Sequence, residues 1–448
     1  MPPPAGPHDQ VLAEDVSLDW VRGDMLGLEI PAHGEALRAG GEVFLTTAFR
    51  AAGALDADNR VVRITRFEDC PGGSTGRKLL LSVAYERSTA DLPTDLFVKF
   101  SRDFEDTIRD RAKNQMEAEV RFALLSRSRG FPIAVPLCLF ADYHHGSGTG
   151  ILITQRIPFG TGVIEPLYEK CRDYEMPEPL EHYRALTRAV ARLAGAQKSG
   201  RLAEGVAEYF PFDPEKAAAN DRIRYTERQI LNRVSRFAAF AGAYPQLLPA
   251  NIASPDFAAT LARAAPRFLE HELAIKQYLY GQPDFIALCH WNANVDNAWF
   301  WRNAEGALEC GLLDWGRVSQ MNVALALFGG WSAAEIDIWN NRLDELLTLF
   351  VTEFAAGGGP VLDIAELKFQ LQLFVALMGL AWLLDAPALI QAQIPNLSEI
   401  KDRLDPRFKA NETARVQLHM MTTVLNLWQT HDFGGVLDRF LRRINVRA

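Results

Sequence analysis

Apolar and polar residues alternate over several short stretches in the first third of the chain. Alternation at every second residue is typical of strands that bury one face. A glycine-dense stretch at 70–77 separates two of these stretches. The pattern also predicts a helix or a helix pair over 35–53 and a helix with an apolar stripe over 107–128. The five strands that this pattern predicts are 61–67, 78–85, 95–100, 135–141 and 150–157.

The remainder of the chain is predominantly helical, with apolar residues at helical spacing over 214–241, 257–279 and 364–384. A strand-rich island at 285–313 interrupts it, and residues 303–306 are typical of a hairpin turn. The pattern predicts an α+β protein with an N-terminal extension, 1–34, that is partly disordered. A small lobe over 35–160 and a large, mostly helical lobe over 161–448 follow it.

Composition narrows the class of protein. The 448 residues carry a net charge of -9, which argues against nucleic acid or an anionic membrane as a partner. The five cysteines are scattered and odd in number, so they indicate neither disulfides nor a zinc site. The N-terminus lacks the pattern of a signal peptide, and the longest apolar run, 373–384, is too short to span a membrane. We therefore expect a cytoplasmic protein; its oligomeric state cannot be read from the sequence.

One polar segment in the strand-rich island carries the most specific chemistry. It has the pattern His290-x-Asn292-x-x-x-x-Asn297, and Asp314 follows at the end of an apolar strand. Amide and carboxylate oxygens are ligands that Mg²⁺ accepts, and a hairpin over the intervening residues would return Asp314 beside Asn297. The two are therefore candidate magnesium ligands.

Lys99 lies inside an apolar strand, where an ammonium group is costly unless it is paired. A phosphate and a carboxylate on the following helix would satisfy it. Glu119 is the better candidate because core-facing Val120 and Phe122 follow it, and Glu117 is the alternative.

The glycine-dense stretch contains Gly72, Gly73 and Gly76. Without a Cβ, such residues let backbone N–H groups approach phosphates closely. Glycine-rich hairpin turns are also common for structural reasons, so this signal depends on its context.

Together these residues resemble the aminoglycoside phosphotransferase and choline kinase superfamily. Residues 290–297 are similar to its H-G-D-x-x-x-x-N motif, and 312–315 are similar to its "IDW" motif. Segments 91–99, 119–122, 132–136 and 190–196 resemble the ecdysteroid-kinase-like branch. The resemblance implies a bilobal protein-kinase-like fold, whose small lobe has a five-stranded antiparallel sheet plus a helix. It also implies ATP and Mg²⁺ as cofactors and a small-molecule hydroxyl as the phosphoryl acceptor.

The resemblance also implies roles for single residues. It assigns Lys99 to the α- and β-phosphates, Glu119 to pairing with Lys99, and Asn297 and Asp314 to the metal. It implies further that His290 braces the backbone of the loop.

Two positions depart from the family pattern. Trp291 replaces a glycine at a variable position, and Asn292 occupies the position of the catalytic Asp. An amide takes no proton from a hydroxyl, although its oxygen can accept a hydrogen bond and orient that hydroxyl. General-base help is typically worth about 10²–10⁴-fold in rate. Asp296 is a remote candidate for a substitute base, because its side chain should diverge from that of Asn297.

Three functions therefore stay open. The first is a small-molecule phosphotransferase whose activity is reduced by Asn292. The second is a pseudokinase that binds nucleotide or partners without phosphoryl transfer, and the third is another transfer from ATP, such as nucleotidylation. The set of Lys99, Glu119, Asn297 and Asp314 favours the first, because a chain free of catalysis would be expected to lose its metal ligands.

Overall fold

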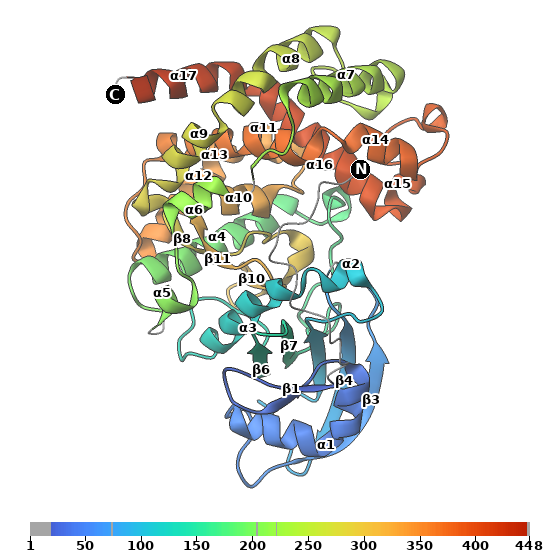
Figure 1. The fold of residues 1–448 in the computed structure, drawn as a ribbon, viewed down its shortest axis with the longest axis vertical. Coiled ribbons are helices and arrows are strands. Elements are labelled where there is room, and N and C mark those ends of the chain that lie inside the picture. Colours follow the sequence, from blue (N-terminus) through green and yellow to red (C-terminus); the bar gives the residue numbers. More distant parts are fainter. Residues whose placement is uncertain (1–18, 73–74, 203–204, 221, 446–448) are drawn as a thin grey trace, which may run out of the picture. The chain divides into compact units, whose positions relative to one another are not determined.

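The computed structural model describes residues 19–72, 75–202, 205–220 and 222–445 and forms two compact units (Figure 1). The first comprises residues 1–127 and 136–156, and the second comprises 128–135 and 157–448. The chain thus passes to the second unit after Arg156, close to the predicted boundary at 160. The predicted N-terminal disorder falls mainly on residues 1–18, which lie outside the described residues, as does Gly73.

The first unit is built on a five-stranded antiparallel sheet in the order β3-β4-β5-β7-β6, which confirms the predicted architecture. A two-stranded sheet of β1 and β2 precedes it. The elements of this unit are β1 (Trp20–Arg22), β2 (Glu29–Pro31), α1 (Gly34–Ala51), β3 (Val61–Asp69), β4 (Lys78–Tyr85), β5 (Asp95–Phe100), α2 (Thr107–Asp110), η1 (Lys113–Gln115), α3 (Met116–Leu125), β6 (Cys138–His144) and β7 (Thr149–Gln155).

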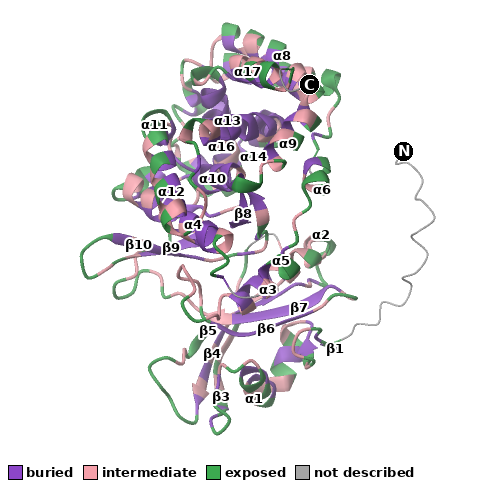
Figure 2. Cartoon of the chain, turned by 90° about the vertical axis from the view of Figure 1, so that its left-hand side faces the viewer, coloured by how far each residue is buried: buried purple, intermediate pink, exposed green. Residues whose placement is uncertain are grey.

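Different helices cover the two faces of this sheet. α1 packs its apolar stripe on one face in the main core of the unit, and α3 packs on the other face against β6 and β7 (Figure 2). Side chains of β4 alternate between buried and half-buried, as the period of a strand requires. The face that carries α3 also carries Lys99 of β5, which is how α3 reaches this lysine.

The predicted helix over 107–128 is wrong in its first half, because the structure breaks it into α2, η1 and α3. Asp106 caps α2 by accepting hydrogen bonds from the N–H groups of Ile108 and Arg109. No residue of α2 or η1 is buried, whereas α3 begins where the buried stripe begins, at Met116. Without an apolar face to pack, the segment before Met116 has little to hold it in one long helix.

The second unit is mainly helical, with two small strand pairs. Its elements up to the strand island are η2 (Asp173–Glu175), α4 (Pro179–Lys198), α5 (Val206–Tyr209), α6 (Pro214–Ala219), α7 (Glu227–Ala243), η3 (Pro245–Leu247), α8 (Pro255–Glu270), α9 (Glu272–Tyr280) and η4 (Pro283–Phe285). The island contains β8 (Ile286–Cys289), η5 (Val295–Asn297), β9 (Ala298–Arg302), β10 (Leu308–Leu312) and β11 (Ser319–Asn322). The elements after it are α10 (Val323–Trp331), α11 (Ile336–Asn341), α12 (Leu343–Ala356), α13 (Ile364–Met378), η6 (Gly379–Leu383), α14 (Ala386–Gln393), η7 (Leu397–Glu399), α15 (Pro406–Ala410), α16 (Glu412–Thr430) and α17 (Phe433–Asn445).

The strand island positions the polar motif. β9 and β10 form the predicted antiparallel hairpin, and β8 pairs with β11, a strand that the hydrophobic pattern does not predict. α4 packs against both β8 and β10. The loop from His290 to Asn297 therefore joins two strands that are each anchored in the core of this unit.

The apolar run at 373–384 lies in α13 and in its π-helical continuation η6. By length and composition, the stretch Ile364–Leu383 is the single described helix that could cross a membrane. Two thirds of its most apolar window is buried inside the second unit (67%), as expected for a core helix.

Candidate phosphoryl-transfer site

Lys99 of β5 and Glu119 of α3 form a buried ion pair in the first unit. The Lys99 Nζ lies 2.6 Å from the Glu119 Oε2, and the two residues are 5% and 4% exposed. Glu117, the alternative partner, instead pairs with Arg121 and His145. The structure therefore brings Lys99 to Glu119, while the role of the pair towards phosphates stays a prediction.

A second lysine accompanies this pair. The register of β4 and β5 places Lys78 directly opposite Lys99, so both side chains project from the same face of the sheet. Lys78 donates a hydrogen bond to the Gly72 carbonyl (3.3 Å). Sequence reasoning missed Lys78, although its position right after the glycine-rich turn was a usable signal.

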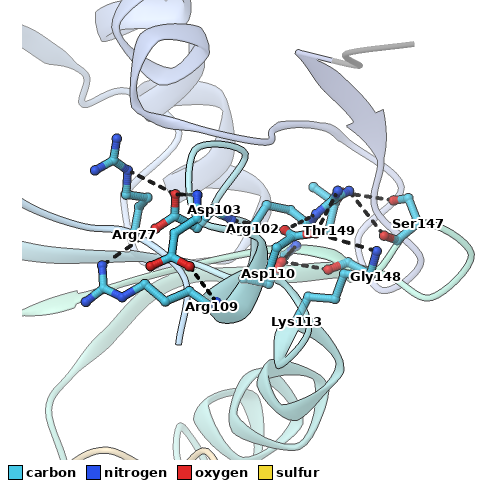
Figure 3. Close-up of polar contacts among 12 residues, drawn as sticks. Arg77, Arg102, Asp103, Arg109, Asp110, Lys113, Ser147, Gly148 and Thr149 are labelled. Atoms are coloured by element: carbon cyan, nitrogen blue, oxygen red, sulfur yellow. Dashed lines mark hydrogen bonds and ion pairs between the residues drawn. The ribbon is translucent and has the colours of Figure 1, made fainter. Parts of the chain in front are cut away.

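A cluster of charged side chains holds the glycine-rich turn (Figure 3). The Asp103 carboxylate is buried and lies 3.6 Å from both the Arg77 Nε and the Arg109 Nη1. Arg109 donates to the Gly72 carbonyl (3.0 Å), and the Phe100 N–H donates to the Arg77 carbonyl (2.8 Å). A single buried carboxylate thus ties together both ends of the turn.

Gly76 is required by this packing. Its φ is +53°, and a Cβ there would lie 1.8 Å from the Phe100 carbonyl oxygen. Gly72 also has a positive φ, +104°, but a Cβ there would meet open space. The contact with β5 therefore explains the glycine at 76, and the approach of phosphates to this turn stays a prediction.

In the second unit, His290 braces the polar loop. Its Nε2–H donates to the Leu313 carbonyl (2.9 Å), and its Nδ1 accepts from the Asn292 N–H (2.9 Å). The Trp315 ring packs at 4.5 Å between centroids. Because both ring nitrogens bind backbone, the geometry fits the structural role that the resemblance implies and leaves the ring no nitrogen for proton abstraction.

Asn297 and Asp314 lie at the same end of the β9–β10 hairpin. The Leu313 N–H donates to the Asn297 carbonyl (3.0 Å), and Asp314 is the next residue. The Asn297 Nδ2 donates to the Asn292 carbonyl (2.9 Å), which turns its Oδ1 the other way. This oxygen and the Asp314 carboxylate are the hard donors that Mg²⁺ prefers, and two such protein groups are a usual number for it.

Asp314 has a left-handed backbone conformation, with φ of +62°. This conformation costs a non-glycine residue about 1–2 kcal/mol, and such strain is typical of functional sites. In the described part of the chain, no group of three or more His, Cys, Asp or Glu side chains is arranged to hold a metal ion.

The side-chain oxygen of Asn292 is not free to orient an acceptor hydroxyl, in contrast to the expectation from the sequence. This Oδ1 accepts hydrogen bonds from the Lys170 Nζ (3.1 Å) and the Asn294 Nδ2 (2.6 Å). The oxygen that was expected to orient an acceptor hydroxyl is therefore already occupied. Lys170 comes from an irregular loop 122 residues earlier, and no sequence pattern connects it with Asn292.

Among the described residues of the second unit, the carboxylates of Asp173, Asp296 and Glu335 each have a buried oxygen without a described partner. Asp173 accepts a hydrogen bond from the Tyr183 O–H (2.6 Å), but its Oδ1 is buried and has no partner among the described residues. Burial raises the pKa of Asp173 to about 7. Asp296 also has a buried Oδ1 without a described partner, and burial raises its pKa although the nearby Lys170 charge lowers it. Such an enclosed side chain is poorly placed to serve as a substitute base.

No family model and no curated protein matches the sequence of this chain. Solved structures do match. A choline kinase from Cryptosporidium parvum is 12% identical, with a TM-score of 0.42, and the match covers 88% of this chain and 97% of that one. A microcompartment-associated aminopropanol kinase is 13% identical, with a TM-score of 0.40 and coverage of 87% and 98%. An ethanolamine kinase from Plasmodium vivax is 12% identical, with a TM-score of 0.39 and coverage of 82% and 83%.

Aminoglycoside phosphotransferases are also among the matching structures. The ecdysteroid-kinase-like branch and the role of Asn292 stay predictions. The superfamily of the aminoglycoside phosphotransferases and choline kinases likewise stays a prediction from the sequence.

Proposed function

We propose that this protein is an ATP- and magnesium-dependent phosphotransferase that acts on a hydroxyl of a small molecule. The observation that carries the proposal is the His290-braced loop, which brings residues Asn297 and Asp314 to the same end of a hairpin. Two oxygen donors held in this way fit Mg²⁺, which fills its other positions with water and phosphate oxygens.

The proposed function assigns roles to residues within each unit taken by itself. In the first unit, the buried Lys99 ammonium, oriented by Glu119, would bind phosphate oxygens, and Lys78 beside it would add positive charge. In the second unit, Asn297 and Asp314 would hold the metal. Bound Mg-ATP would supply the phosphoryl group and neutralise its charge, while the protein aligns the reacting groups.

Asn292 favours one alternative, a pseudokinase that binds nucleotide without phosphoryl transfer. An amide cannot act as a base, and its oxygen is already bonded to Lys170. The chain retains the oxygen donors of Asn297 and Asp314, which a protein without catalysis would not need. We therefore favour the phosphotransferase function over the pseudokinase function. ATP turnover at a low rate would separate the two functions, because the pseudokinase predicts none.

Mg-ATP is expected to raise the melting temperature, because it binds only the folded state. At about 100 times its Kd, a ligand adds about 2.7 kcal/mol to the free energy of unfolding. Replacing Asp314 by Ala is expected to abolish the magnesium-dependent part of this shift. Asp314→Asn should weaken it while keeping a residue that tolerates the left-handed backbone.

The measurement is a thermal melt with ATP alone and with Mg-ATP. Asp337→Ala, at an exposed position of α11, is the matched control and should keep the full shift. If wild type shows no shift at millimolar Mg-ATP, the proposed function is wrong. If Asp314→Ala keeps the magnesium-dependent shift, Asp314 is not a metal ligand.

A further inference from the structure

Asn292 presents its amide nitrogen, and not its oxygen, to the surroundings of the loop. Its Oδ1 faces the Lys170 Nζ at 3.1 Å and the Asn294 Nδ2 at 2.6 Å. A lysine ammonium has donors only, so the Asn292 atom that faces it has to be the oxygen. The Nδ2 makes no hydrogen bond to a described residue and is not among the enclosed side-chain atoms, and Asn292 is half-buried.

The backbone of Lys170 is held in place by a buried arginine. Its carbonyl accepts a hydrogen bond from the Nε of Arg415 (3.1 Å), a residue of α16 that is 6% exposed. The other end of this guanidinium lies 3.2 Å from the Oε2 of Glu169. The next residue, Cys171, is buried and has a left-handed backbone with φ of +59°. Strain of this kind persists only where the surroundings impose it, so the Lys170–Asn292 contact belongs to a built framework.

An aromatic pair adjoins the same loop. Trp291, directly before Asn292, packs edge-on against Trp382, with 5.3 Å between ring centroids. Trp382 lies in the π-helical turn η6 and is 41% exposed. π-Helical turns occur frequently at functional sites, and an exposed indole offers a flat apolar surface for a ring.

These two features constrain the phosphoryl acceptor. At the position where the resemblance implies a carboxylate base, the loop offers an ammonium and an amide N–H₂, neither of which takes a proton from a neutral alcohol. Two such donors instead stabilise an oxygen that is already negative. We propose that the phosphoryl acceptor is a phenol, which carries an acidic hydroxyl on an aromatic ring. Lys170 and the Asn292 Nδ2 bind it as the phenolate, and its ring packs on Trp291 and Trp382.

The proposed step needs no general base. The phenol loses its proton to solvent on binding, and Lys170 stays protonated. The phenolate oxygen then forms a bond to the γ-phosphorus, and the bond from this phosphorus to the β–γ bridging oxygen breaks with its electron pair on ADP. The products are an aryl phosphate and ADP. This inference rests on the proposed phosphotransferase function and narrows its acceptor.

A phenol whose ionised form absorbs visible light tests the inference directly. We would titrate the full chain, with Mg-ADP present, into 4-nitrophenol and follow the phenolate band. A positive charge within hydrogen-bonding distance lowers the pKa of an acidic group by about one unit or more, so wild type should raise the phenolate fraction at a pH below the free pKa of the probe. Lys170→Met should lose this effect, and Lys170→Arg, which keeps the charge, should retain part of it.

Lys198→Met is the matched control, because the Lys198 Nζ binds only the Pro283 carbonyl on an exposed surface among its described contacts. It should behave as wild type. A melt with Mg-ATP shows whether each variant still folds and binds nucleotide. If wild type leaves the phenolate band unchanged, or Lys170→Met keeps the effect, the inference is overturned.

Transfer assays give the second readout, with phenols compared with benzyl alcohol and cyclohexanol. Transfer to phenols that falls in Asn292→Asp supports the inference, because a carboxylate would repel the phenolate. If only the alcohols are phosphorylated, and Asn292→Asp increases this transfer, the phenol inference is overturned. The proposed phosphotransferase function is then still supported. If the protein does not bind Mg-ATP at all, the proposed phosphotransferase function is wrong. Failure of the phenol inference can therefore be distinguished from failure of the proposed function.

Discussion

Replacing Glu119 by Gln is expected to destabilise the protein by about 3 kcal/mol, since removing one partner of a buried ion pair typically costs that much or more. The Lys99 ammonium would lose the carboxylate oxygen that lies 2.6 Å away, in a place where both residues are almost fully buried. The loss is measured as the free energy of unfolding in denaturant. Hydrogen exchange of the amides in β5 and α3 would locate it in the first unit.

Glu117→Gln is the matched control, because Glu117 lies two residues before Glu119 on the same helix and outside the buried pair. Its partners are Arg121 and His145, and the His145 side chain is 80% exposed. Pairs near the surface contribute about 0–1 kcal/mol, so this variant should be nearly as stable as wild type. Equal losses in the two variants would contradict the assignment of Glu119 as the buried partner.

A double variant separates stability from function. Replacing a buried ion pair by apolar residues of similar size is often neutral or stabilising. Lys99→Met combined with Glu119→Leu should therefore be more stable than Glu119→Gln alone, yet it should show no melting shift with Mg-ATP. If the double variant still bound Mg-ATP as wild type does, the proposed role of Lys99 towards phosphates would be wrong.

Asp173 is expected to make the protein less stable as the pH rises from about 4 to about 7. Burial raises its pKa from 3.8 to about 7, so the folded state binds the proton more tightly than the unfolded state. The stabilising effect of this proton is fully present below the unfolded pKa and is lost as the pH passes the folded pKa. A difference of about three pKa units corresponds to about 4 kcal/mol.

The check is the free energy of unfolding across this pH range for wild type and Asp173→Asn. The variant keeps an oxygen for the Tyr183 hydroxyl but has no carboxyl to titrate, so its profile should be flatter by about 4 kcal/mol. Asp405→Asn serves as the control. Arg407 lowers the pKa of Asp405 to about 2, so the titration of Asp405 changes the stability only below pH 4. The change of the free energy of unfolding with pH above pH 4 should therefore be the same in Asp405→Asn as in wild type. A wild-type slope that survives in Asp173→Asn would assign the titration to another group.

Local patterns were sufficient for much of the first unit. The strands Lys78–Tyr85 and Asp95–Phe100 have the predicted bounds, because the alternation of side chains in a strand is visible within a few residues. A lysine inside such a strand needs a partner, and the buried stripe of the next helix includes Glu119. The contact between Lys99 and Glu119 could be anticipated because both residues occupy positions that the periodicity itself defines.

The hairpin of the second unit was predictable for a similar reason. Its turn at 303–306 and its flanking strands are local, and antiparallel pairing returns Asp314 towards Asn297. The break of the predicted helix at 107–115 was not anticipated, because it depends on side chains such as Asp106 that bind local backbone in place of extending the helix.

The sequence by itself thus determined the α+β class, the five strands of the main sheet along the chain, and the pairing of Lys99 with Glu119. The roles of Asn297 and Asp314 at a metal stay predictions. Tertiary structure alone decided how Asn292 is used. Its oxygen is taken by Lys170 from 122 residues away, and the Lys170 carbonyl is bound by Arg415 from 245 residues further along. Periodicity reports which face of an element is buried, whereas contacts between distant loops depend on how complete elements pack. The chemistry that Asn292 offers therefore became visible only in the folded chain.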